Sequence, residues 1–75
     1  MQVEKLMKLS ELHDADKKAK IEMQDGSTLI CDPDWWSEEE DGLAYSVRLI
    51  EPWDKYQVGS LVTIHEEMIL SVKEI

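Results

Sequence analysis

The sequence predicts a mainly β fold, in which a short N-terminal helix precedes a small, strongly bent barrel of five strands. Near the N-terminus, apolar residues recur at helical spacing, and the pattern then changes to an alternation of period two. Two Asp-Gly pairs mark tight turns between strands. The chain has 75 residues, which suffices for one small domain over residues 1–75 with a thin core.

The helix is expected over residues 1–13. A helix this short is marginal by itself in water, so it must pack on the rest of the protein. The polar stretch "HDADKKAK" ends it and leads into the barrel, residues 19–75. The apolar side of the helix is formed by Val3, Leu6, Met7, Leu9 and Leu12.

Period-two alternation begins at Ala19 and predicts the first strand. Asp25-Gly26 predicts a hairpin turn, because glycine tolerates a positive φ. The stretch "STLIC" is then the second strand, with Leu29 and Cys31 on one face. Pro33 cannot donate to a strand ladder, so it marks a strand end, an edge or a bulge. The buried face of the first strand is expected to be Ala19, Ile21 and Met23.

A second pair, Asp41-Gly42, opens the third strand, "LAYSVRLIE". A long hairpin with its tip at residues 38–41 therefore joins the second and third strands. "PWDKYQVGS" is a polar turn, "LVTIH" the fourth strand, "EEM" one helical turn and "ILSVKEI" the fifth strand. Five short strands in so small a chain favour a barrel of SH3 or Sm type. The inward residues of the third strand are expected to be Leu43, Tyr45, Val47 and Leu49.

Two stretches resemble the Sm-like family. "KIEMQDGSTLIC" resembles the first Sm motif, in which alternating apolar residues lead to a glycine (Gly26) and then to an apolar residue (Leu29) three positions on. "VTIHEEMILSVKEI" resembles the closing strands of small Sm-like proteins of Gram-positive bacteria and their mobile elements. The resemblance covers roughly residues 19–75. It implies an Sm-like or SH3-like barrel, and it leaves a homo-oligomer open because Sm-like proteins often form rings by pairing edge strands.

The resemblance does not extend to the RNA-binding residues of the family. After the second strand, Sm-like proteins carry a short Asp-x-x-Met-Asn-like segment, whereas this chain has "DPDWWSEEED". Near the fourth strand, the family has an Arg-Gly or similar pair, whereas this chain has His65, Glu66 and Glu67. The resemblance therefore implies the fold and not an RNA pocket.

The charge balance is strongly acidic. Lys and Arg total 8, Asp and Glu total 17, and the net charge is −9. Nucleic-acid affinity comes largely from cations that neutralise phosphates, so direct binding of DNA or RNA is disfavoured. An acidic surface suits a protein partner with a basic surface, including proteins that themselves bind nucleic acid. The alternative is that the acid excess only keeps a small domain in solution.

A cytoplasmic location is expected. Cys31 is the one cysteine, so no internal disulfide forms, and a reducing compartment is the simpler assignment. No apolar run approaches the length of a membrane span. Acids interrupt the apolar positions near the N-terminus, which departs from the layout of a signal peptide. We therefore expect no membrane association.

The strongest binding candidate is the stretch "DPDWWSEEEDG", residues 32–42. Adjacent residues of an extended chain point to opposite faces, so one tryptophan can enter the core while the other faces water and anchors an Arg-rich partner. Alternatively both pack, one in the barrel and one under the helix. The acids form either a phosphate-like ridge, as in phage-encoded nuclease inhibitors that resemble DNA, or a solvated hairpin tip. The candidate binding residues are Trp35, Trp36, Glu38, Glu39, Glu40 and Asp41.

Metal and catalytic sites have little support. The acidic run lacks the ligand offsets and flanking helices of a calcium EF-hand. His13, Cys31 and His65 are the soft-ligand candidates, and they form no close sequence pair. A Cys31–His65 dyad would lack an orienting third residue and an oxyanion hole. The three glycines lie in separate turns, so there is no phosphate-binding loop. We expect no enzyme activity, cofactor or metal.

Three functions remain open. The first is a non-enzymatic, acidic protein-binding module that docks on, or blocks, the basic nucleic-acid-binding surface of a partner, as an inhibitor from a phage or mobile element would. The second is an Sm-like ring that binds RNA, which rests on resemblance of fold. It is disfavoured because Arg48, Lys55 and Lys73 are the only cations after residue 20. The third is an assembly subunit whose last strand, "ILSVKEI", pairs with a partner strand.

Overall fold

A computed structural model describes residues 3–40 and 42–75 of the chain. One helix is followed by five antiparallel strands in a single sheet of order β4-β3-β2-β1-β5. This architecture confirms the predicted mainly β fold with a short N-terminal helix. The elements are α1 (Glu4–Asp14), β1 (Ala19–Met23), β2 (Thr28–Glu39), β3 (Gly42–Leu49), β4 (Leu61–His65), η1 (Glu66–Met68) and β5 (Ile69–Glu74).

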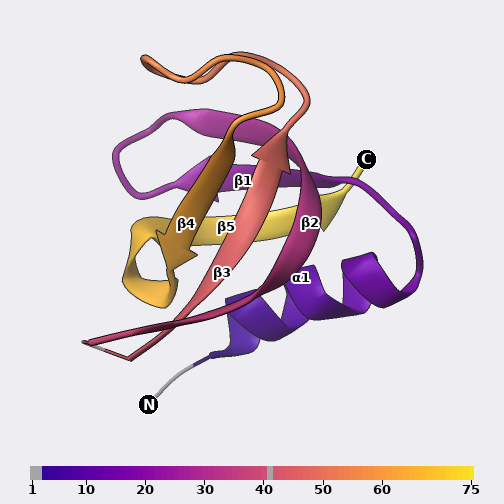
Figure 1. Ribbon diagram of the computed structural model, residues 1–75, viewed down its shortest axis with the longest axis vertical. Coiled ribbons are helices and arrows are strands. Elements are labelled where there is room, and N and C mark those ends of the chain that lie inside the picture. The colour runs from indigo at the N-terminus through magenta and orange to yellow at the C-terminus, as the bar shows by residue number, and fades with distance from the viewer. Residues whose placement is uncertain (1–2, 41) are drawn as a thin grey trace.

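The sheet bends because its longest strand, β2, takes part in both halves. The first part of β2 pairs with β1, from Thr28 to Cys31, and the part from Cys31 to Glu39 pairs with β3. Figure 1 shows the result: β2, β3 and β4 run diagonally across the front, while β1 and β5 cross behind them. The edge strands β4 and β5 are joined by the short η1 helix, so the chain turns directly from one half of the sheet to the other.

Helix α1 lies below the sheet in Figure 1 and packs on it with one stripe of leucines. Leu6, Leu9 and Leu12 are buried at i, i+3, i+6 spacing. Met7 was expected on this side, but its side chain is 51% exposed, because it lies about 100° around the helix from Leu6. The helix was predicted over residues 1–13, and α1 begins at Glu4, after the N-cap residue Val3, and ends at Asp14.

The start of α1 is stabilised by a residue from the far end of the sequence. The backbone N–H of Lys5 donates to Oε1 of Glu66 in η1 at 3.0 Å, and the Lys5 Nζ lies 3.9 Å from Oε2 of the same carboxylate. Val3, at the N-cap position, makes no side-chain cap hydrogen bond. The Glu66 carboxylate therefore replaces a local cap, and its negative charge lies at the positive end of the helix.

The core is built by the alternation predicted for β1 and β3. Ala19, Ile21 and Met23 are buried in β1. In β3, Leu43 departs from the prediction and is 37% exposed. It lies beyond Ala44, the last β3 residue paired with β4, so no further strand covers it. Ala44 was expected on the outer face and is instead buried. It is paired with Ser37 of β2 on one side and with His65 of β4 on the other. The buried inward residues of β3 are Tyr45, Val47 and Leu49.

Gly26 of the first Asp-Gly pair and Pro33 lie at a turn and at a bulge, as their residue types predicted. Gly26, in the β1–β2 turn, has a φ of 91°, which glycine tolerates because it lacks a Cβ. Pro33 lies within β2, next to a register shift between Pro33 and Trp35, as its missing donor predicted. The β2–β3 hairpin was expected to have its tip at residues 38–41. Pairing continues to Glu39 and Gly42, so the tip is shorter, and Asp41 lies outside the described residues.

In the part of the chain that the structure describes, no helix has the length and apolar character required to cross a membrane.

Candidate functional site

Trp35 and Trp36 lie in different environments although they are adjacent. Trp36 is directly opposite Tyr45 in the ladder and packs against the core, with the two ring centroids 5.3 Å apart at 73°. Trp35 lies opposite Ser46 and is 59% exposed. Of the two arrangements left open by the sequence, the structure has the one in which one tryptophan packs against the core while the other faces water.

His13 at the end of α1 holds Trp35 from the side. The His13 Nδ1–H donates to the carbonyl oxygen of Pro33 at 3.0 Å, which joins the helix to the bulge in β2. The imidazole and the Trp35 indole make an edge contact, with centroids 5.6 Å apart at 70°. Trp35 is exposed to water, and the contact with His13 restricts the orientation of its ring. A ring with a fixed orientation loses less conformational entropy when it binds a partner.

An acidic arm extends from the two tryptophans to the hairpin tip. Glu38 pairs with Leu43 and Glu39 with Gly42, so the arm is a regular two-stranded ribbon. Glu38, Glu39 and Glu40 are all exposed. The Ser37 hydroxyl donates to Oε1 of Glu39 at 3.1 Å. We call Trp35 together with Glu38, Glu39 and Glu40 the acidic tryptophan arm.

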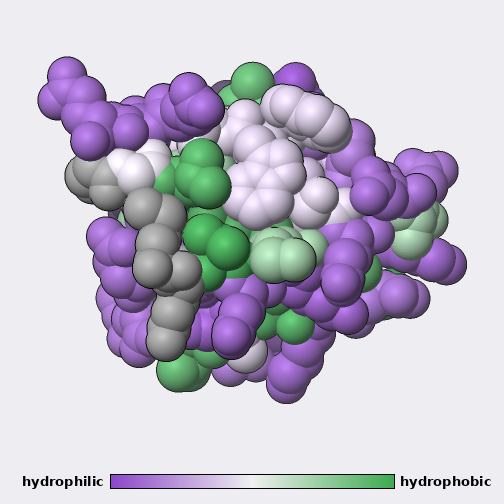
Figure 2. Space-filling view, turned by 90° about the horizontal axis from the view of Figure 1, so that it is seen from below, coloured by the Kyte–Doolittle hydropathy of each residue, from purple (hydrophilic) through white to green (hydrophobic). Residues whose placement is uncertain are grey.

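Apolar surface accompanies this arm on one face of the molecule. Figure 2 views the molecule from below and shows hydrophobic and near-neutral residues gathered in the middle of the face, with hydrophilic residues around them. The elements on this side of Figure 1 are α1 and the β2–β3 hairpin. Their large exposed apolar side chains are Met7, Trp35 and Leu43. An apolar centre with a polar rim is the usual composition of a protein-binding surface.

The chain has three cations after residue 20, and each has a local partner. Arg48 Nη1 donates to the carbonyl oxygen of Gly59 at 2.9 Å. Lys73 Nζ lies 3.5 Å from Oε1 of Glu22, and Lys55 Nζ lies 5.9 Å from the centre of the Tyr56 ring. Thirteen of the seventeen acids follow residue 20, against these three cations, so this part of the chain carries the net negative charge.

The residues considered for a thiol dyad lie apart. Cys31 pairs with Leu49 and His65 with Ala44, which places them five residues apart along β3, about 17 Å in an extended strand. Burial, followed by the nearby Asp32 carboxylate, raises the pKa of the Cys31 thiol to about 12. Residues 3–40 and 42–75 gather no group of three or more His, Cys, Asp or Glu side chains that could hold a metal ion.

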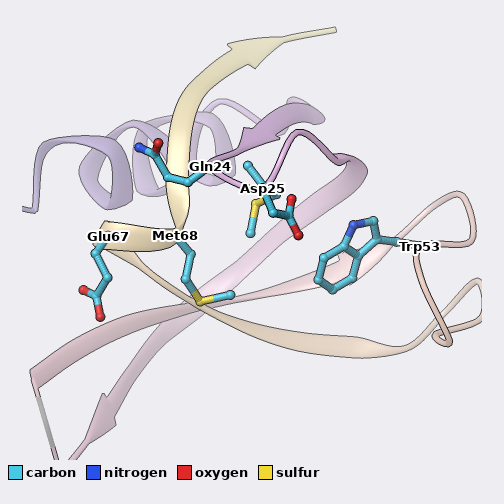
Figure 3. Close-up of a pocket in the computed structure, with 6 residues that line it drawn as sticks. Gln24, Asp25, Trp53, Glu67 and Met68 are labelled. Carbon is cyan, nitrogen blue, oxygen red and sulfur yellow. The ribbon is translucent and has the colours of Figure 1, made fainter.

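The structure also forms a pocket that the sequence did not reveal. The stretch from Pro52 to Ser60 was interpreted as a polar turn, but Trp53 in it lines a pocket with residues of the β1–β2 turn and η1 (Figure 3). One residue could have indicated it, because a tryptophan in an otherwise polar turn usually packs against another part of the protein. Its partners are distant in sequence, so the pocket itself could not be derived from the local pattern.

The chain was compared with protein-family models, curated proteins and solved structures. No family model, curated protein or solved structure matches it.

Proposed function

We propose that this chain is a non-enzymatic, acidic protein-binding module, and that the acidic tryptophan arm docks on a basic, nucleic-acid-binding surface of a partner protein. One observation carries the proposal: Trp35 is 59% exposed, is in edge contact with His13 and lies three positions before the first of three exposed glutamates. A large aromatic ring beside carboxylates suits arginine, whose guanidinium stacks on aromatic faces and pairs with carboxylates.

The location of the charge supports a partner of this kind. Basic surfaces that bind nucleic acid present Lys and Arg at the spacing of phosphates. A ribbon of glutamates can offer carboxylates to the same cations and thus compete for that surface. Such competition would give the acidic residues of the arm a role in binding, in addition to keeping the protein in solution.

The Sm-like ring that binds RNA remains the second proposal. The edge strands β4 and β5 favour it, because pairing of edge strands is how such rings form. The local contacts of Arg48, Lys55 and Lys73 disfavour it, since these are the cations after residue 20. It predicts a discrete oligomer, which size-exclusion chromatography with light scattering would detect.

Capture from a host-cell lysate tests the first proposal. The tagged wild-type chain is compared with Glu38→Gln/Glu39→Gln/Glu40→Gln and with a control of equal charge change, Glu4→Gln/Glu11→Gln/Glu74→Gln. All six glutamates are exposed, so both variants should fold. Each capture is run with and without nuclease, and bound proteins are identified by mass spectrometry.

The proposal expects basic nucleic-acid-binding proteins that survive nuclease, are retained by the control and are lost from the arm variant. Retention of the same proteins by the arm variant would show that the arm is not the site. Capture that disappears with nuclease would support the RNA-binding ring instead.

A further inference from the structure

A second site is lined by residues outside the acidic tryptophan arm. It is a pocket of about 290 Å³ between the β1–β2 turn, η1 and the loop after β3. In Figures 1 and 3 the β2–β3 hairpin and the loop after β3 extend in different directions from the sheet. This volume is close to the lower limit of about 300 Å³ for sites of drug-sized ligands, so it suits one side chain. The lining residues are Met23, Gln24, Asp25, Trp53, Glu67 and Met68.

The floor of the pocket is fixed by hydrogen bonds between the turn and η1. The Gln24 backbone N–H donates to the carbonyl oxygen of Met68 at 2.9 Å, and the Gln24 Nε2–H donates to that of Ile69 at 3.1 Å. Met23 is 3% exposed and belongs to the core. The pocket is therefore largely formed before any ligand arrives, which reduces the entropy lost on binding.

The aromatic wall is also held in place. Trp53 and Tyr56 form an antiparallel bridge with hydrogen bonds of 3.1 and 2.8 Å, and their rings stack at 5.7 Å and 8°. Stacking occupies one face of the indole, so the pocket is bounded by the remaining face or edge. The Nζ of Lys55 lies 5.9 Å from the centroid of the Tyr56 ring.

A carboxylate completes the pocket. Figure 3 shows the Asp25 carboxylate pointing toward the Trp53 ring, the Met68 side chain extending toward the same ring, and the Glu67 carboxylate pointing away from it. Asp25 Oδ1 accepts hydrogen bonds from the Ser27 hydroxyl at 2.6 Å and from the Ser27 N–H at 2.9 Å. These bonds lower the pKa of the Asp25 carboxyl, which is therefore ionised at neutral pH.

We infer that this pocket binds a single arginine side chain of a partner protein. The aliphatic part of arginine would lie on the thioether of Met68, its guanidinium would stack against Trp53, and Asp25 would accept its N–H groups. Arginine fits better than lysine, because its planar head can contact the ring and the carboxylate together. The inference rests on the proposed function only in taking the ligand from a basic protein, since its site is separate from the arm.

Titration of the ¹⁵N-labelled chain with blocked arginine, N-acetyl-arginine methylamide, tests this inference by NMR. Blocked citrulline, which has the same shape without the charge, is the matched control ligand. Free arginine and a short peptide with one central arginine distinguish a metabolite from a protein as the source. The titrations are repeated on Asp25→Asn, Trp53→Leu and the arm variant Glu38→Gln/Glu39→Gln/Glu40→Gln.

The expected result is a saturable shift of the Trp53 indole and of the Gln24 and Asp25 amides with blocked arginine and with the peptide, but not with citrulline. Asp25→Asn and Trp53→Leu should each weaken binding about threefold or more, whereas the arm variant should not change it. Shifts centred on Trp35, equal responses to citrulline, no saturable shift, or tighter binding of free arginine than of the peptide would overturn the inference. Because no partner is needed, its failure would leave the proposed function of the arm untouched.

Discussion

At the scale of single residues, two adjacent tryptophans show how far a local pattern predicts a site. The rule that neighbours in a strand point to opposite faces allowed one ring packed against the core and one exposed ring, beside the alternative in which both rings pack. The rule did not say which of the two rings is exposed, because the bulge after Pro33 determines the face to which each side chain points. The contact between His13 and Trp35 could not be predicted either, since it joins the end of a helix to a strand more than twenty residues away.

The buried thiol of Cys31 gives a prediction for the dependence of stability on pH. Burial raises the pKa of this thiol from 9.0 to about 12 in the folded protein. Below about pH 9 the thiol is protonated in both states, and its contribution to stability is fully present. As the pH rises from 9 toward 12, the unfolded chain releases its proton more readily than the folded one, and this contribution is lost.

Urea unfolding of the wild type and Cys31→Ala at several pH values between 8 and 11 measures the effect. The wild type should lose stability more steeply above pH 9 than the variant, because Tyr and Lys titrate in both and cancel. In the wild type, Cys31 should be unreactive to thiol reagents at pH 8 until the chain unfolds. Parallel pH profiles for the two proteins would show that the thiol is not shielded.

At the scale of elements, the local signals were sufficient for most of the strands. The exception is β2, which was predicted to be "STLIC" and instead continues through Pro33 to Glu39, because pairing with β3 extends it. Alternation gave β1 and β3, the Asp-Gly pair gave the first hairpin turn, and "EEM" gave η1. The helix start was different, because its cap comes from Glu66, sixty-one positions after Lys5. No residue near position 3 signals this bond, so only the folded chain reveals it. The pocket beside Trp53 was missed for the same reason, as its walls come from three separate segments.

The cap predicts different effects for two adjacent glutamates. Glu66→Ala removes the acceptor of the Lys5 N–H, and it should lower the free energy of unfolding by about 1 kcal/mol. Glu67→Ala is the matched control, because Glu67 is exposed on the same 3₁₀ turn, and it should change the free energy by less than about 0.5 kcal/mol. Urea titration followed by far-UV circular dichroism gives both values. Equal losses for the two variants would mean that Glu66 does not cap α1.

At the scale of the whole molecule, charge and shape are divided between two surfaces. The acidic tryptophan arm belongs to the β2–β3 hairpin, and the Trp53 pocket is formed by the β1–β2 turn, η1 and the loop after β3. Both combine an aromatic ring with carboxylates, and together they suit a basic protein better than a nucleic acid. Composition alone predicted this preference, because the net charge of −9 is a property of the sequence. The separation into two surfaces required the fold.

Displacement of nucleic acid from a purified captured partner tests the central claim most directly. A fluorescent oligonucleotide bound to that partner is titrated with the wild-type chain, with the arm variant Glu38→Gln/Glu39→Gln/Glu40→Gln and with the control Glu4→Gln/Glu11→Gln/Glu74→Gln, and anisotropy is recorded. The account predicts that the wild type and the control release the oligonucleotide equally, whereas the arm variant needs about tenfold more protein. If the arm variant releases it as readily as the wild type, or if the wild type leaves it bound, docking through the acidic tryptophan arm is contradicted.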